Sequence, residues 1–283
     1  MNRAQRRMQE KQSKKAKGTG APNDPELKVN VEMIQPWSDV LMRTTLPDTV
    51  VEGMIKITDE ILADPERKNW GHNLAGQIED EPIIPHEMMQ NYKLGSSGNI
   101  FVFLLNVIGE YVKQCMFQQA TMAERYRIEN EEYMTQMKSA WVVSQWENEY
   151  NPIHIHTECA ISTVMYLKVP KFLPSRKPER DDDGNIVFVG ASHPTTRLAR
   201  GIYKHKPKVG DFFVFPAHLQ HTVYPFRTDG DFERRSVSFN ADFIDKTSYE
   251  KMQEQQRQMQ QSQAPLPPIS GAPEKLTINT ENV

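Results

Sequence analysis

Cysteine is nearly absent from this 283-residue chain, which holds only Cys115 and Cys159. A disulfide scaffold is therefore excluded, and the chain fits a reducing cytoplasm. The chain also lacks an excess of charge of either sign, with a net charge of −3 and a pI of about 6.3, which argues against a general nucleic-acid binder. No apolar run approaches the ~18 residues of a membrane span, and the N-terminus has no apolar secretion signal.

Both ends of the chain have the composition of solvated tails. Residues 1–28 are basic with almost no apolar side chains, and we expect a disordered tail there, a basic arm that touches nucleic acid being the alternative. Residues 246–283 are rich in Gln and Pro, and we expect a frayed helix over 253–263 followed by an extended linker. One folded domain is therefore predicted over residues 29–245.

The first part of this domain, residues 46–137, has helical patterns. Apolar residues recur at helical spacing from Val51 to Leu62, and Asp64-Pro65 ends the run. A second helix is predicted over 99–117; it is apolar on most sides, so we expect it to be buried. A third, charged stretch covers 122–137. We expect these helices to pack against the outside of a β core.

The β core is predicted over residues 140–245. An entry strand at 29–34 precedes the helices. β-branched and aromatic residues then predict strands at 140–146, 161–169, 186–189, 212–215, 222–224 and 236–239, with a His-rich strand around 154. About eight short strands separated by turn signals predict a mainly β fold with flanking helices, whose core is a jelly-roll, or double-stranded β-helix, of cupin-like type.

The His-rich segment Asn-Pro-Ile-His-Ile-His-Thr-Glu ends at Glu158. In a strand, His154, His156 and Glu158 would point to one face, because strand side chains alternate. Two histidines at this spacing also occur by chance. The case for a metal site is strengthened by a distal His221, in Phe-Pro-Ala-His-Leu-Gln-His. His and carboxylate groups are the ligands of non-haem iron.

A strand with an arginine follows. Arg234, Ser236 and Ser238 should share one face, and Arg235 should lie on the other. A buried arginine is costly unless it binds an anion, and its planar guanidinium suits a carboxylate. A metal site together with a carboxylate grip is what a 2-oxo acid cosubstrate requires.

The order of these motifs resembles a known family. His-x-His, a strand at 162–170, a Gly-Asp turn, Phe-Pro-x-x-x-x-His and Arg-x-Ser-x-Ser-Phe-Asn follow one another as in the 2-oxoglutarate and iron(II)-dependent oxygenases, which have a prolyl-hydroxylase-like double-stranded β-helix. The resemblance covers about 30–245 and is closest to an uncharacterised branch of marine phages and bacteria. It implies Fe(II) and 2-oxoglutarate as cofactors, His221 as the distal ligand, and Arg234 with Ser236 on the far carboxylate of 2-oxoglutarate. It also implies hydroxylation of a C–H bond with release of succinate and CO2.

The chain departs from the general family pattern at the acidic ligand. In one register, His154, His156 and His221 form a three-His site. In the other, His156 is the usual histidine and Glu158 is the acid. The resembled branch has His-x-His followed by Pro without a fixed acid, and Thr157 stands at the Pro position here. We favour the three-His set, but both sets can hold iron(II) and leave open positions.

Two other functions are compatible with these patterns. A three-His cupin-type dioxygenase would consume oxygen without 2-oxoglutarate, and a non-catalytic binding or structural phage protein would use the same fold. For the oxygenase we expect 2-oxoglutarate and O2 as cosubstrates, no membrane partner, and a cytoplasmic location, in the host if phage-encoded. The primary substrate is left open among a protein, a nucleobase and a metabolite. Basic residues in the loop 191–200 suit an acidic substrate, although a solvated loop is the simpler interpretation.

Overall fold

The computed structural model describes residues 39–177, 179, 181–190 and 201–262. The predicted basic tail, entry strand, basic loop at 191–200 and final linker lie outside these residues. The strands are β1 (Met42–Thr45), β2 (Tyr133–Gln145), β3 (Asn151–His154), β4 (Ile161–Lys168), β5 (Ile186–Val189), β6 (Ile202–His205), β7 (Asp211–Pro216), β8 (Gln220–Val223) and β9 (Arg234–Asp245). The helices are α2 (Asp48–Ala63), α3 (His86–Asn91), α4 (Ile100–Gln119), α5 (Met122–Asn130) and α6 (Lys246–Ser262), with 3-10 turns at Gly71–Asn73 and Gly95–Ser97.

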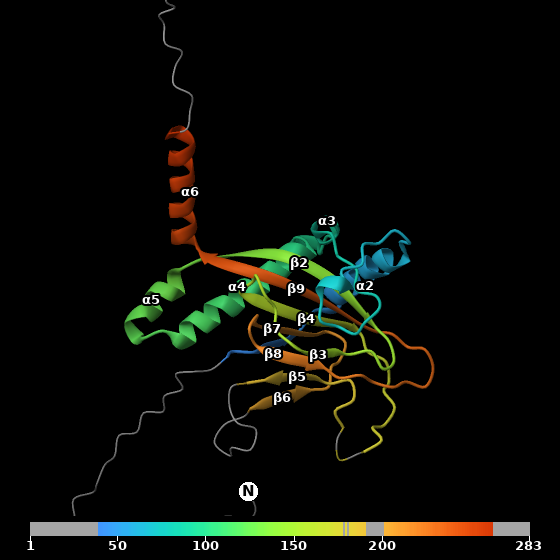
Figure 1. The fold of residues 1–283 in the computed structure, drawn as a ribbon. Helices are drawn as coiled ribbons and strands as arrows, with labels where there is room; N and C mark the ends of the chain where they lie inside the picture. Colours follow the sequence, from blue (N-terminus) through green and yellow to red (C-terminus); the bar gives the residue numbers. More distant parts are fainter. Residues whose placement is uncertain (1–38, 178, 180, 191–200, 263–283) are drawn as a thin grey trace, which may run out of the picture. The chain divides into compact units, whose positions relative to one another are not determined.

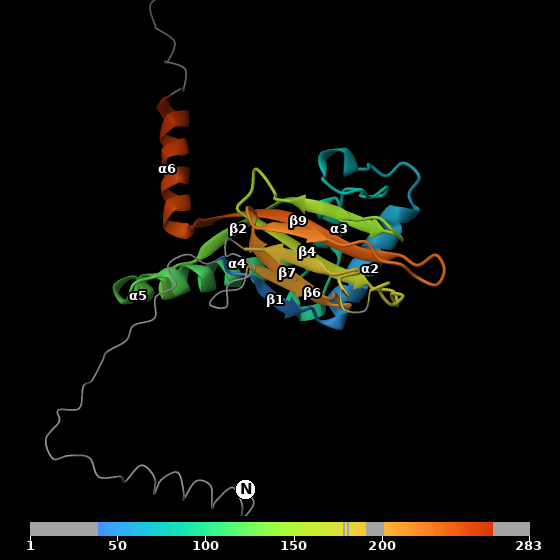
Figure 2. The ribbon, with the colours of Figure 1, turned by 60° about the horizontal axis from the view of Figure 1, so that its bottom comes forward.

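The described strands form two antiparallel sheets (Figures 1 and 2). One has the order β1-β7-β4-β9-β2 and the other β3-β8-β5-β6. Along the chain, β2 pairs with β9, β3 with β8, β4 with β7, and β5 with β6. The chain is therefore a double ribbon whose successive pairs alternate between the two sheets. This is the double-stranded β-helix predicted from the sequence.

Strand alternation divides the apolar side chains between two clusters. On β4, Met165 and Leu167 belong to the cluster that faces the helices, whereas Val164 and Tyr166 belong to the cluster between the sheets. The inner cluster also contains Phe188 of β5. The central strand β4 is therefore apolar on both faces, because helices cover one side and the smaller sheet covers the other.

The helices pack on the outer face of the larger sheet, as expected. Met54 of α2 and Leu104 of α4 are completely buried in one cluster with Val237 and Phe239 of β9. The amide N–H of Val102 donates to the side chain of Asn99, which caps the start of α4. In Figure 1, α4 extends from near α5 towards α3, and α2 lies to the right.

Two sequence expectations about these helices need correction. The charged stretch predicted as one helix over 122–137 ends at Asn130, and β2 begins at Tyr133. Pairing of Tyr133 with Asp245 of β9 extends the sheet into this region, so tertiary pairing overrides the local pattern. By length and composition α4 is apolar enough to cross a membrane, contrary to our expectation for the chain. Core helices of soluble proteins pass the same test, and α4 buries one face against the sheet.

Candidate active site

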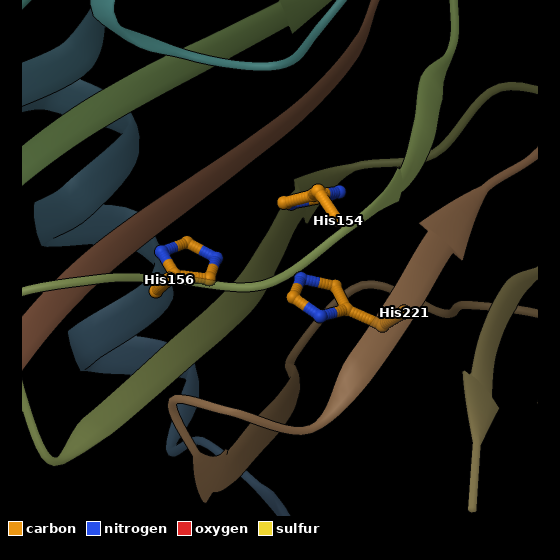
Figure 3. Close-up of side chains that lie close together, drawn as sticks. All are labelled: His154, His156 and His221. Atoms are coloured by element: carbon orange, nitrogen blue, oxygen red, sulfur yellow. The ribbon is translucent and has the colours of Figure 1, made fainter.

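Strand pairing in the smaller sheet brings two histidines together. His154 is the last residue of β3 and lies directly opposite His221 of β8. Their ring centroids are 4.2 Å apart. Figure 3 shows both rings projecting into the same space.

His156 reaches this space by a different route from the one predicted. β3 ends at His154, so His156 and Glu158 do not continue the strand, and the face-sharing argument fails beyond His154. Instead, the amide N–H of His156 donates to the carbonyl oxygen of Ala217, 2.9 Å away. This bond holds the loop beside the start of β8, and the His156 ring stacks parallel to that of His221 with 5.2 Å between centroids.

The three imidazoles converge on one point. One ring nitrogen from each lies within 4.8 Å of the others. Nδ1 of His154 is 2.7 Å from the carbonyl oxygen of Pro152, and Nδ1 of His221 is 2.9 Å from that of Leu219. Because a carbonyl oxygen only accepts, both Nδ1 atoms carry the proton, which leaves both Nε2 atoms free for a metal.

Burial keeps these imidazoles neutral. It lowers the pKa of His156 to about 4 and that of His221 to about 3, with smaller contributions from neighbouring histidines. Burial also lowers the pKa of His154. Three neutral, convergent imidazoles fit a divalent transition metal, because the ligand nitrogen must be unprotonated.

Glu158, the alternative acidic ligand, lies apart from this cluster. It is exposed, with a positive φ of 60°, and its carboxylate is not within the group of described side chains that approach within 4.8 Å. Its backbone carbonyl oxygen accepts from Nζ of Lys138 at 2.6 Å. His218, three residues before His221, is exposed and pairs with Asp39.

Arg234 lies in the larger sheet and faces the same cavity. It is 1% exposed, and its guanidinium donates to Oε1 of Gln145 and to the carbonyl oxygen of Gly184. It also lies over the ring of Phe226, 5.0 Å from the centroid. No carboxylate of the described residues pairs with it, and burial lowers its pKa to about 10.

Arg235 is buried like Arg234, but its guanidinium has carboxylate partners. It points to the opposite face and pairs with Glu233 and Asp59. The sequence prediction that these two arginines lie on opposite faces is confirmed by this difference and by the cavity lining. Only Arg234 is left with a buried positive charge that an external anion can neutralise.

The three histidines and Arg234 line one cavity of about 600 Å³. Its wall includes the three histidines and, along β9, Arg234, Ser236, Ser238 and Asn240. The Tyr166 hydroxyl is buried without a hydrogen-bond partner among the described residues, and burial raises its pKa to about 12. A buried cation and a free hydroxyl in one wall fit a carboxylate ligand.

Sequence reasoning missed the residues on the far wall of the cavity. Trp70, Leu74 and Glu81 lie in an irregular segment before α3, yet they line the same cavity. Nothing in their spacing indicates a site. Asn240 lies beside His156, and the side chain of Gln145 accepts a hydrogen bond from Arg234.

Residues 139–240 match the family described as "Putative 2OG-Fe(II) oxygenase". The matched residues include the three histidines and Arg234. Together with the three convergent histidines, this match indicates an oxidoreductase with iron(II) and 2-oxoglutarate as cofactors. No curated protein matches the sequence.

Several solved structures are similar to this chain at low identity. A prolyl-4-hydroxylase from Pseudomonas putida is 15% identical, with a TM-score of 0.40, and the match covers 71% of this chain and 91% of that one. A viral collagen prolyl hydroxylase from Paramecium Bursaria Chlorella virus-1 is 12% identical, with a TM-score of 0.39 and coverage of 71% and 94%. An oxidoreductase of the 2OG-Fe(II) oxygenase family from Burkholderia pseudomallei is 15% identical, with a TM-score of 0.38 and coverage of 70% and 84%. At this level of similarity they do not bear on the substrate.

Proposed function

We propose that this oxygenase hydroxylates a C–H bond of its substrate, with iron(II) held by His154, His156 and His221. The three neutral imidazoles described above support this ligand set over the one with Glu158. When bound, iron(II) and 2-oxoglutarate supply the oxidising power for the reaction, with release of succinate and CO2. The protein binds and orients both cosubstrates and the substrate.

The observation that carries the proposal is that Arg234 lines the cavity of the three histidines and has no carboxylate partner among the described residues. We propose that its guanidinium binds the distal carboxylate of 2-oxoglutarate, with Ser236 as a second donor. Gln145 and the Gly184 carbonyl oxygen hold the guanidinium in place, so little side-chain entropy is lost on binding. At the other end of the cavity, the three neutral histidines would hold the metal.

Titration of the iron(II)-loaded protein with 2-oxoglutarate under anaerobic conditions tests this assignment. We expect the weak visible charge-transfer band of the chelate in the wild type. Arg234→Met should weaken 2-oxoglutarate binding by about 10- to 100-fold, because it removes a charge-assisted bidentate pair. Arg227→Met is the control, since Arg227 donates to the carbonyl oxygen of Pro174 at the surface.

Other outcomes identify the alternatives. Iron binding without a band in the wild type indicates a three-His dioxygenase that does not use 2-oxoglutarate. Failure to bind iron indicates a binding or structural module. Equal affinity in Arg234→Met and the wild type would refute the role of Arg234.

A further inference from the structure

The segment 77–83 forms an irregular extra edge beside β2. The amide N–H of Ser144 donates to the carbonyl oxygen of Asp80, and that of Val142 to the carbonyl oxygen of Pro82, at 3.1 and 2.9 Å. Asp80 points away and pairs with Arg67. Glu81, the next residue, therefore turns to the other side, where it lines the cavity that contains the three histidines.

The Glu81 carboxyl is buried and incompletely bonded. The residue is 1% exposed, and Oε2 has no hydrogen-bond partner among the described residues. No described lysine or arginine forms an ion pair with it within 4.0 Å. Leaving such a group unsatisfied destabilises the folded protein, so a ligand that supplies the missing donor has a ready binding partner.

Gly76 has no side chain, so the Glu81 carboxyl and a second acceptor, the side-chain amide oxygen of Asn151, can both lie close to it. A Cβ atom at Gly76 would lie 2.5 Å from Oδ1 of Asn151 and 3.1 and 3.2 Å from the two carboxyl oxygens of Glu81. The amide oxygen and the carboxyl thus lie around one spot, and both accept hydrogen bonds. Asn151, at the start of β3, also lines the cavity.

The electrostatics at this wall favour positive charge. The carboxylate of Glu149 is anchored by the amide N–H groups of Glu79 and Trp146. Burial, with a contribution from Glu149, raises the pKa of the Glu81 carboxyl to about 8. The Glu81 carboxyl therefore holds its proton at neutral pH, and a cation that binds beside it would favour its ionised form. The aromatic rings of Trp70 and Trp141 in the same lining also suit a cation.

We propose that Glu81, together with Asn151, binds a cationic nitrogen group of the substrate, an amino or guanidino group. This inference rests on the proposed function, because it places the substrate in the cavity of the metal ligands. Arg234 binds the anionic cosubstrate on the β9 wall, and Glu81 binds the cationic end of the substrate on the wall formed by segment 77–83. The cavity therefore separates its two ligands by charge.

The test compares matched pairs of small probes. N-acetyl-lysine methylamide and N-acetyl-arginine methylamide carry the cation, and the N-acetyl methylamides of norleucine and citrulline are their neutral mates. Binding is measured by ligand-observed NMR on metal-free protein and on the anaerobic complex with iron(II) and 2-oxoglutarate. We expect at least one cation to bind about tenfold or more tightly than its mate in the wild type, and this preference to vanish in Glu81→Gln.

Glu79→Gln is the matched control, because Glu79 is an exposed acid two residues away, and it should keep the preference. A preference that persists in Glu81→Gln overturns the proposal, as does the lack of any preference in the wild type. The charge-transfer band of the 2-oxoglutarate chelate should form normally in Glu81→Gln. If it fails in the wild type, the proposed function is wrong, while the NMR data on metal-free protein still decide the role of Glu81.

Stability provides a second readout. Glu81→Met should keep or raise the thermal unfolding midpoint, because it removes an unsatisfied buried carboxyl. A fall in the midpoint for both Glu81→Met and Glu81→Gln would show that the carboxyl stabilises the fold, and would overturn its assignment to a ligand.

Discussion

At the scale of single residues, three buried ionisable side chains show how pairing separates structural from functional groups. Arg235 is buried but is neutralised by Glu233 and Asp59. Arg234 and Glu81 are each 1% exposed and have no oppositely charged partner among the described residues. Folding pays the desolvation cost of both groups without a matching ion pair, which is the pattern expected where ligands supply the partners.

The pH dependence of stability should reveal Glu81 directly. Its pKa is raised to about 8 in the folded protein, from an ordinary value of 4.5. Between these values the folded state holds a proton that the unfolded state lacks, so the free energy of unfolding falls as pH rises. The Glu81 contribution is complete below pH ~4.5 and is lost as pH rises through 8, with a slope of up to about 1.4 kcal/mol per pH unit.

Urea unfolding of metal-free protein at pH 5.5, 7.0 and 8.5 measures this slope. Glu81→Gln should remove it, whereas Glu79→Gln should follow the wild type. Wild-type and Glu81→Gln curves that run parallel over this range would contradict the raised pKa of Glu81.

At the scale of secondary structure, the side-chain hydroxyl of Thr163 on β4 connects to the backbone of β9. The ladder pairs Ser162 with Asn240 and then Met165 with Val237. Between these pairs, Oγ1 of Thr163 donates to the carbonyl oxygen of Phe239 and accepts from its amide N–H, at 3.0 and 3.1 Å. A buried side chain thus satisfies backbone groups in the centre of the sheet.

Thr163→Val should therefore destabilise the protein by about 1–3 kcal/mol, because it leaves both backbone groups of Phe239 unpaired and buried. Thr163→Ser keeps the hydroxyl and should cost less than Thr163→Val. Urea unfolding of the two variants checks this. Similar stability of Thr163→Val and the wild type would show that the ladder closes without the hydroxyl.

At the scale of the whole molecule, the proposed metal ligands on strands and the proposed 2-oxoglutarate ligand Arg234 belong to different sheets. His154 and His221 lie on β3 and β8 of the smaller sheet, and Arg234 lies on β9 of the larger one. A metal would bind to the smaller sheet and its loop, whereas 2-oxoglutarate would connect the two sheets. Binding of each ligand should stabilise the fold by mass action.

Thermal unfolding with Mn(II), and then with Mn(II) and 2-oxoglutarate, should show two separate increments. A ligand at 100 times its Kd adds about 2.7 kcal/mol. His221→Ala should lose both increments, whereas Arg234→Met should keep the metal increment and lose that of 2-oxoglutarate. Loss of the metal increment in Arg234→Met would contradict separate sites on the two sheets.

The sequence by itself determined the fold class, most strand positions and the three segments that supply His154 and His156, His221, and Arg234. These follow from local information, because strand alternation and turn residues act over a few positions. It did not determine that the strand ends at His154, because a loop bond to Ala217 sets the place of His156. Nor did it determine where β2 begins, because pairing with β9 decides this.

The choice between His154 and Glu158, and the far wall with Glu81, required the tertiary structure. Glu158 has a strand-like spacing from His156 in the sequence, but its positive φ places it in a turn. Glu81 lies 73 positions before His154 in the sequence, and only the packing of segment 77–83 against β2 brings it to the same cavity. Contacts between distant segments have no local signature, so burial, the lack of an ion partner and the shape of the cavity were decided by packing alone.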